Sequence, residues 1–276
     1  MRDAAGFTVV ALEDARGCWK QAAAWLEAVS LDRCRVQFGV VRAVRPPRPI
    51  ESYRAAGGKG GWPHNSQALA ADVLSGLTET ARRRVRKDGG KVLLATPEGF
   101  VPHTWHVPNG GVAVGAKMWV RRYSVAPVSA PLGTVVHELG HLLFDWPDLT
   151  WERRFAQECL MARGASGERA LDPAPPCAPL LVEAGWRDPV PLTRGLTVGS
   201  LGPERVGAME WGRWSVLVEI RDHGGGARLL MYCQPREDRQ ASPRICARIP
   251  LTGSDLARSV LGLLAVHLRR LDGRNT

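Results

Sequence analysis

Residues 135–148 read VVHELGHLLFDWPD and contain the pattern His-Glu-x-x-His at positions 137–141. Apolar residues surround the pattern, which predicts a buried helix. On a helix, residues four positions apart lie on one face, one turn apart, so His137 and His141 can reach the same metal ion. In a chain of this composition the pattern is expected by chance only about 0.01 times. We therefore interpret it as a metal site rather than as two core histidines.

This pattern is typical of zinc hydrolases. A Zn²⁺ ion bound by histidines lowers the pKa of a bound water molecule to about 7 and polarises a carbonyl group. Glu138, next to the first histidine, is placed to accept a proton from that water as a general base. The sequence thus predicts His137 and His141 as zinc ligands and Glu138 as the catalytic residue. The predicted reaction is hydrolysis of a peptide bond, with attack of water on its carbonyl.

A third protein ligand is needed to complete a catalytic zinc site. Four acidic residues follow the pattern: Asp145, Asp148, Glu152 and Glu158. Pro147 should end the helix soon after His141 and bring an aspartate back toward the ion. A glutamate on a following helix is the other arrangement, and Glu158 lies 17 residues beyond His141. On the residues alone, the choice stays open.

Upstream of this helix, apolar strands alternate with amphipathic helices. We expect strands at 6–12, 35–44 and 91–96, strand-like runs within 111–125, and helices at 19–29 and 66–87. Pro131 should open the helix of the motif, with Ser129 as its cap. Residues 45–65, rich in Pro and Gly, form a long irregular connection. The alternation predicts an α/β fold.

Downstream of about residue 195 the pattern changes to one dominated by strands. Alternating or apolar runs predict strands at 214–220, 227–233 and 244–250, followed by a last helix capped at Ser254. We therefore divide the chain into a catalytic domain, residues 1–195, and a smaller β-rich C-terminal part, residues 196–276, that ends in a helix.

Composition and charge exclude several classes of protein. With 45% hydrophobic residues the chain should fold rather than remain disordered. The net charge of +10 suggests nucleic acid as a ligand, but the basic residues are scattered. Their densest run, residues 82–87, ends a predicted helix, where cations complement the helix dipole. No apolar run approaches the ~20 residues that span a bilayer. We expect neither nucleic acid nor a membrane as a partner; the oligomeric state stays open.

The six cysteines contain no Cys-x-x-Cys pair, which argues against a structural zinc site built from thiolates. Their even number permits disulfides in an oxidising compartment. Cys233 and Cys246, on two neighbouring predicted strands, are one candidate pair. Cys159 and Cys177 are the other.

The motif and its surroundings resemble a known family. HELGHLLFDWPDL, residues 137–149, is similar to the HExGHxxGLPDLY stretch of immune inhibitor A-type bacterial metallopeptidases, members of the metzincin group. Residues 158–161 look like the segment that carries this family's Met-turn, with Met161 beneath the zinc. Residues 177–190 resemble its closing segment, so the resemblance covers about residues 6–192.

The resemblance implies an α/β, metzincin-type (zincin) catalytic domain with a mixed sheet and an active-site helix. It implies Zn²⁺ as the cofactor, a protein or peptide as the substrate, and an endopeptidase activity. The family is exported, which favours a secreted protein, although no signal peptide is visible. An edge strand just before the active-site helix binds the substrate in metzincins. By resemblance, residues 110–120 are a candidate for this edge, and an interior strand is the alternative.

By the same resemblance Asp148 is the third zinc ligand, because Pro147-Asp148 matches the proline-aspartate pair of the family. Two departures accompany this match. Phe144 stands where the family has a glycine at a sharp turn of the backbone. One extra residue also precedes the pair, which puts Asp148 seven residues after His141 instead of six.

Three other functions compete with this prediction. The chain could be a gluzincin-like zinc aminopeptidase with Glu158 as the third ligand. If the insertion at Phe144 displaces that ligand, it could be an inactive protease-like binding protein. A basic nucleic-acid binder is the third alternative. His103 and His106, in the sequence PHTWH, are a weaker candidate for a second metal site.

Overall fold

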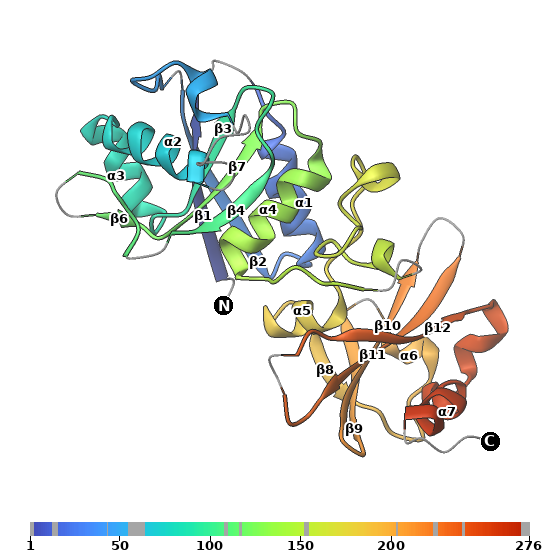
Figure 1. Cartoon of the computed structure of the whole chain (residues 1–276). Helices are drawn as coiled ribbons and strands as arrows, with labels where there is room; N and C mark the ends of the chain where they lie inside the picture. Colours follow the sequence, from blue (N-terminus) through green and yellow to red (C-terminus); the bar gives the residue numbers. More distant parts are fainter. Residues whose placement is uncertain are drawn as a thin grey trace. The chain divides into compact units, whose positions relative to one another are not determined.

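The structure is a computed structural model of the chain (Figure 1). It describes residues 3–12, 16–42, 44–54, 64–107, 110–115, 118–151, 155–202, 204–222, 226–238 and 241–271. The chain divides into two compact units. The first comprises residues 1–147 and 163–174, and the second comprises residues 148–162 and 175–276.

The first unit is built on a five-stranded mixed sheet. Its strands are β1 (Asp3–Ala11), β2 (Cys34–Val41), β3 (Val92–Thr96), β7 (Arg122–Pro127) and β4 (His103–His106), in the order β2-β1-β3-β7-β4. All neighbours run parallel except β4, which pairs antiparallel with β7. Every residue of β3 is buried, as expected of a parallel strand covered on both faces.

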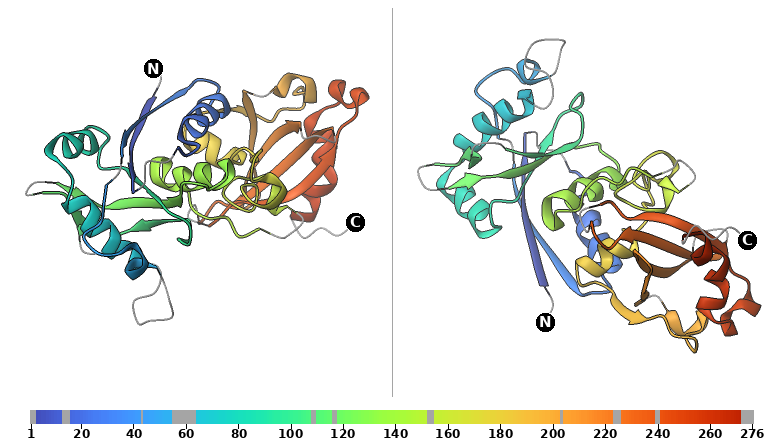
Figure 2. Two further views of the ribbon diagram at one scale, coloured as in Figure 1. Left: turned by 90° about the horizontal axis from the view of Figure 1, so that it is seen from above. Right: turned by 60° about the horizontal axis from the view of Figure 1, so that its bottom comes forward.

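Helices cover both faces of this sheet (Figure 2). On one side lie α1 (Trp19–Val29) and α4 (Leu132–Phe144), and on the other side lie α2 (His64–Ser75) and α3 (Glu79–Lys87). Two short 3-10 helices, Ile50–Tyr53 and Gly167–Arg169, complete the unit. Residues 55–63 of the connection expected at 45–65 lie outside the described residues.

Three local predictions for this unit were wrong. The single helix expected at 66–87 is two helices, because Thr78 starts α3 by accepting a hydrogen bond from the Ala81 amide at 3.3 Å. Pro131, not Ser129, is the N-cap of α4. Residues 110–120 form no edge of this sheet: its edges are β2 and β4, and β5 (Val112–Ala113) and β6 (Trp119–Val120) pair only with each other among the described strands.

The second unit is a five-stranded sheet of order β12-β11-β10-β9-β8. Its strands are β8 (Asp188–Pro191), β9 (Arg205–Trp211), β10 (Trp214–Asp222), β11 (Ala227–Pro235) and β12 (Arg244–Pro250). Its helices are α5 (Ala178–Glu183), α6 (Val198–Leu201) and α7 (Val260–Leu271), with 3-10 turns at Ala156–Glu158 and Gly253–Ala257. The turn at Gly253–Ala257 replaces the helix start expected at Ser254. An apolar core that includes Trp214, Val216 and Leu264 joins the sheet to α6 and α7.

A buried polar cluster lies between the sheet of this unit and two of its other segments, residues 158 and 175–176. The guanidinium of Arg221 donates to the main-chain carbonyls of Glu158, Pro175 and Pro176, and its Nε lies 2.8 Å from a carboxylate oxygen of Glu219. Tyr232 donates its hydroxyl proton to the same Glu219 oxygen. Burial alone would lower the pKa of Arg221, but Glu219 raises it above its ordinary value. The cluster therefore holds residues 158 and 175–176 against the sheet.

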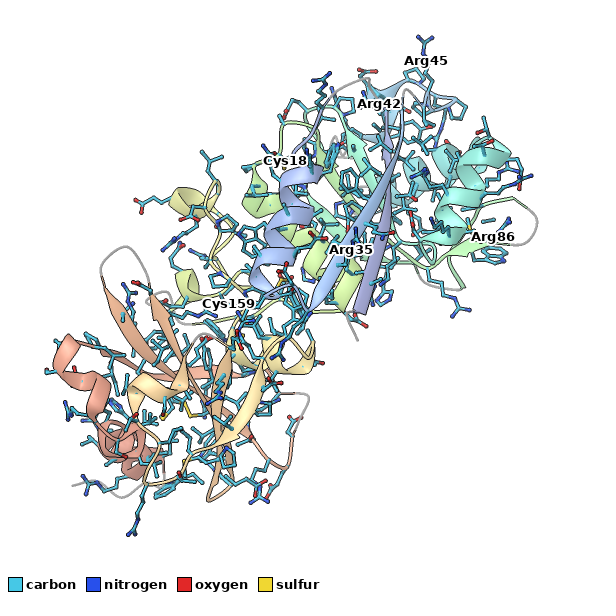
Figure 3. The ribbon with its side chains drawn as sticks, turned by 180° about the vertical axis from the view of Figure 1, so that it is seen from behind. Cys18, Arg35, Arg42, Arg45, Arg86 and Cys159 are labelled. Carbon is cyan, nitrogen blue, oxygen red and sulfur yellow. A yellow bond between two sulfur atoms is a disulfide. The ribbon has the colours of Figure 1, made fainter. Side chains whose placement is uncertain are left out.

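The boundary between the units differs from the predicted division at residue 195. The reason is that β8 pairs in parallel with β9, which places residues 175–195 with the C-terminal sheet. Cys233 and Cys246, on β11 and β12, form a disulfide. Cys159 and Cys177 are free buried thiols, and the Cys177 amide donates to Cys159 Sγ at 3.2 Å (Figure 3). None of the described helices is long and apolar enough to cross a membrane.

Candidate metal centre

The motif His-Glu-x-x-His lies on α4, as its apolar neighbours predict. Val135, Val136, Leu139 and Leu142 of this helix are buried, whereas His137 and His141 remain partly accessible. The first turn of the helix packs against residues 165–170. A Cβ atom on Gly133 would lie 2.3 Å from the Ala165 carbonyl oxygen, and the Gly133 amide donates to Ala170 at 2.7 Å. Only glycine allows this contact, which fixes the start of the helix.

The two imidazole rings face each other at the distance that a shared metal ion requires. Nε2 of His137 and Nε2 of His141 are 3.2 Å apart. Two nitrogens that each lie about 2.0–2.1 Å from a tetrahedral zinc ion are separated by about 3.3 Å. The spacing of the rings therefore fits one zinc ion between them.

The hydrogen bond on the other side of His141 sets its tautomer. Nδ1 of His141 lies 2.5 Å from the main-chain carbonyl oxygen of Trp146. Because a carbonyl oxygen only accepts, the ring proton sits on Nδ1 and the lone pair on Nε2 is directed at His137. A histidine that ligates a metal commonly donates its second nitrogen in this way.

Asp148 completes a group of three metal-binding side chains. Ligand atoms of His137, His141 and Asp148 all lie within 4.8 Å of one another. Two imidazoles and one carboxylate are a donor set that zinc accepts at catalytic sites. The resemblance implies Asp148 as the third ligand, and the structure brings its carboxylate together with both histidines.

The end of α4 explains the extra residue before Asp148. Phe144 is the last helical residue, and the sharp turn comes one residue later, at Asp145, whose φ is 62°. Asp is one of the few residues other than glycine that adopt this left-handed conformation readily. The turn thus comes one residue later than the glycine of the family that the motif resembles. The backbone then returns toward the histidines at Trp146.

Two cations stabilise this helix end. Arg122, on β7, donates to the His141 carbonyl oxygen at 2.8 Å and pairs with the Asp145 carboxylate at 2.6 Å. Lys91 donates to the Leu143 carbonyl oxygen at 3.0 Å, and burial lowers its pKa. Positive charges at this position complement the negative end of the helix dipole and satisfy its last carbonyl groups.

Glu138 is held by hydroxyl groups from two strands of the sheet. Its side chain is buried, and Oε2 accepts a hydrogen bond from Thr104 Oγ1, on β4, at 2.8 Å. Ser124 Oγ, on β7, lies 2.6 Å from Thr104 Oγ1 and 3.2 Å from the Glu138 carbonyl oxygen. Because an ionised carboxylate only accepts, the single proton of Thr104 points at Glu138. The Thr104 hydroxyl therefore orients the carboxylate.

Of the other acidic candidates, Asp145 pairs with Arg122, as described above. Glu158 belongs to the second unit, where one of its carboxylate oxygens accepts from Arg228 at 2.9 Å and from Arg248 at 3.0 Å. Glu152 lies outside the described residues. Met161 is fully buried in the second unit.

His103 and His106 do not face each other. His103 is buried and bonds Ser66 Oγ through Nε2 at 2.8 Å and the Val101 carbonyl oxygen through Nδ1 at 2.7 Å. Ser66 Oγ in turn lies 3.1 Å from the hydroxyl of Tyr123, a tyrosine whose pKa burial raises to about 12. His106 is exposed and accepts a hydrogen bond from Arg122. The two histidines therefore serve separate networks.

Sequence reasoning missed four residues of this site: Thr104, Ser124, Arg122 and Trp146. Each acts through a contact distant in the sequence or through the main chain, and none has a distinctive spacing from the motif. The alternation of β4 holds one usable signal. Because His103 faces α2, Thr104 must face the opposite side of the sheet, where α4 lies.

The chain was compared with known proteins. No family model matches it, and no curated protein does. Among solved structures, it is similar to archaemetzincin from Methanopyrus kandleri, with 14% identity, a TM-score of 0.37, and coverage of 66% of this chain and 94% of that one. A TM-score of this size carries no functional inference, so function must be inferred from the site itself.

Proposed function

We propose that this chain is a zinc-dependent peptidase, and specifically an endopeptidase related to the immune inhibitor A-type enzymes of the metzincin group. One observation carries the proposal. Two Nε2 atoms lie 3.2 Å apart, the Asp148 carboxylate belongs to the same cluster within 4.8 Å, and Glu138 is adjacent on the same helix.

The residues have separate roles in this proposal. His137, His141 and Asp148 hold the zinc ion. When bound, zinc supplies a Lewis acid for the peptide carbonyl and lowers the pKa of water to about 7. Glu138 accepts a proton from the attacking water and passes it to the leaving amine. Thr104 keeps the Glu138 carboxylate from rotating away between these two transfers.

The edge strand β4 supports a peptide as the substrate. It is the last strand in the order of its sheet, and Glu138 is tied directly to it through Thr104. An extended peptide can pair with such an edge through its main-chain groups, independently of its side chains. This proposal moves the substrate-binding edge from residues 110–120 to residues 103–106.

Zinc content tests the ligand set. We expect about one zinc per chain by plasma mass spectrometry for the wild type, and loss of most of it in Asp148→Ala. Glu158→Ala is the matched control, because it also removes a carboxylate but leaves the cluster intact. Retention of zinc by Asp148→Ala together with its loss in Glu158→Ala would favour the aminopeptidase alternative. An absence of zinc in the wild type after reloading would reject the proposed function.

The remaining alternatives have less support. The aminopeptidase needs Glu158 as a ligand, but two arginines already compensate that carboxylate. The inactive binding protein was suggested by Phe144, but the turn at Asp145 accommodates the extra residue. We propose a protein or peptide as the partner, without nucleic acid or a membrane. Export is part of the proposal, and the Cys233–Cys246 disulfide is weakly in keeping with it.

A further inference from the structure

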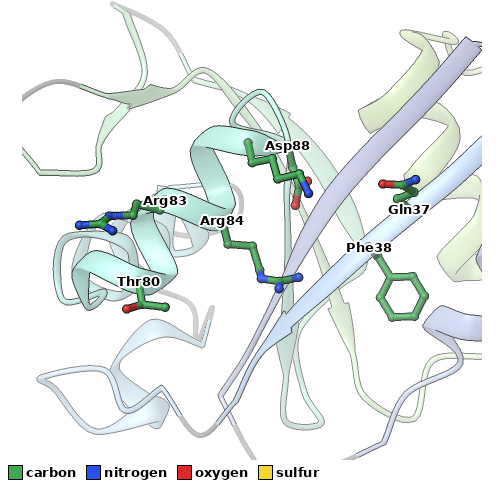
Figure 4. A pocket seen from close by; sticks show the side chains of 7 residues that line it. Gln37, Phe38, Thr80, Arg83, Arg84 and Asp88 are labelled. Carbon is green, nitrogen blue, oxygen red and sulfur yellow. The ribbon is translucent and has the colours of Figure 1, made fainter.

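A second candidate site lies on the first unit, between α3 and the edge strand β2. A cavity of about 280 Å³ opens there (Figure 4). It is lined by Gln37, Phe38, Thr80, Arg83, Arg84, Lys87 and Asp88. Its volume is near the lower end of small-ligand sites, which suits a phosphate group with a small organic substituent.

The lining is rich in cations and in donors that have no partner. Arg84 and Lys87 make no hydrogen bond or ion pair with any residue that the structure describes, and the same holds for the side chain of Gln37. Asp88 contributes the only acidic group to the lining, and its Oδ2 already accepts from Thr8 at 2.6 Å. The cavity is therefore positive and offers donors that can all bind one anion.

Arg84 occupies its position because residue 39 is a glycine. The Arg84 side chain crosses from α3 to β2 and lies against Gly39, where a Cβ atom would come within 1.7 Å of its terminal nitrogen (Figure 4). Arg83, one residue earlier, points away from the strand and pairs with Glu79 at 3.4 Å. The Arg84 guanidinium thus lies against the main chain of β2 instead of extending into solvent.

We propose that this cavity binds a phosphate group, with Arg84 as the principal contact and Lys87, Gln37 and Thr80 as further donors. A guanidinium offers paired N–H groups that match two oxygens of a phosphate, and an ammonium adds a second positive charge. A phosphate has enough acceptor oxygens for all of these donors. This site is separate from the metal centre, and it does not depend on the proposed peptidase activity.

Isothermal titration calorimetry of the full chain at constant low ionic strength tests the site, with inorganic phosphate, pyrophosphate and AMP as probes. We expect Arg84→Gln to weaken binding about tenfold, the usual cost of losing one charge-assisted contact. Arg86→Gln is the matched control, because it removes the same charge from the same helix but does not line the cavity (Figure 3).

Gly39→Ala is the sharper variant, since it changes no charge. The new methyl group must displace the end of the Arg84 side chain, which is flexible, so the fold should persist and phosphate binding should fall as in Arg84→Gln. Circular dichroism checks the fold. Tighter binding of AMP than of phosphate would show that the cavity also contacts the nucleoside, and equal binding would assign the site to phosphate alone.

Two results would overturn the proposal. Absence of binding heat for all three probes would mean that the cavity is not an anion site. Equal weakening by Arg84→Gln and Arg86→Gln, with no effect of Gly39→Ala, would mean that only the general positive charge of α3 attracts the anions.

Discussion

Two buried glutamates, one in each unit, show how the same side chain serves different purposes. Glu138 and Glu158 are 6% and 2% exposed. The first lies within the motif, and the second lies 17 residues after its last histidine. Glu138 accepts from the neutral hydroxyl of Thr104, whereas Glu158 accepts from two arginines, Arg228 and Arg248. The first carboxylate is oriented by a hydroxyl group. The second has its charge compensated.

This difference separates a chemical group from a structural one. A carboxylate that must accept and release a proton needs a fixed position, which a hydroxyl donor provides. A carboxylate paired with two guanidiniums is instead held in place by ion pairs. We therefore assign proton transfer to Glu138 and anchoring of its segment to Glu158.

The largest effect is expected for Glu138→Gln. The amide keeps the shape of the side chain but cannot accept the proton, so turnover of a peptide substrate should fall about 10²–10⁴-fold. Zinc content should stay at the wild-type value, because Glu138 is not a ligand. Stopped assays with a fluorogenic peptide and elemental analysis measure the two quantities. Full activity in this variant would contradict the role that we assign to Glu138.

A large loss of stability is expected for Arg221→Met in the second unit. The change leaves Glu219 buried without its cation and removes the donor to three main-chain carbonyl groups. Breaking a buried pair in this way costs about 3–5 kcal/mol in the free energy of unfolding, measurable by urea denaturation. Arg236→Ala breaks a pair with Glu210 that is about half exposed, and should cost less than about 1 kcal/mol. Similar losses in both variants would show that the cluster is not an anchor.

An intermediate effect is expected for Thr104→Val, which replaces the hydroxyl by a methyl group of the same size. Substitution of residues that orient active-site groups typically costs about 10–100-fold in activity. We expect a fall of this size in kcat, with KM and zinc content nearly unchanged, because the substrate and the ligands are not touched. Thr104→Ser retains the hydroxyl and should recover most of kcat. Equal kcat values for the valine and serine variants would remove Thr104 from the mechanism.

The smallest effect is expected from His103, on the face of β4 opposite Thr104. Burial lowers the pKa of His103 below its ordinary value, so the unfolded chain binds a proton more readily than the folded one. This contribution to stability is present above the unfolded pKa of about 6.5 and is lost as the pH falls toward the folded pKa. The urea midpoint of the zinc-free protein should therefore decrease as the pH is lowered from 7.5 to 5.5. The decrease should be smaller in His103→Gln. An unchanged pH dependence in that variant would contradict this assignment.

Local patterns predicted the elements whose sequence carries its own signal. The helix of the motif, the apolar strand β3 and the alternating strand β10 depend on short-range periodicity, and each lies where it was expected. The break between α2 and α3 depends on the cap at Thr78. The sequence concealed it because the apolar residues keep a helical spacing across the break. The spacing of apolar residues shows which face is buried, but it does not show whether one helix or two carry that face.

Contacts between distant segments escaped prediction for a different reason. Thr104 and Ser124 are ordinary polar residues in the sequence, and only the antiparallel pairing of β4 with β7 brings both to Glu138. The compact units divide the chain differently from the expected boundary at residue 195, because β8 pairs with β9, a strand that follows it in the chain. Pairing partners of strands are set by the whole fold, so no single stretch of sequence contains them.

The left-handed residue at the end of α4 has a consequence for how relatives of this chain should be sought. Asp145 makes the turn at the end of the helix, where the family that the motif resembles has a glycine one residue earlier, and the aspartate that follows the proline is displaced by the same one residue. A search pattern that fixes the number of residues between the second histidine and this aspartate passes over such a chain. A pattern that allows one insertion, and accepts Asp or Asn as well as Gly at the turn, would retrieve it and test how often evolution has used the longer spacing.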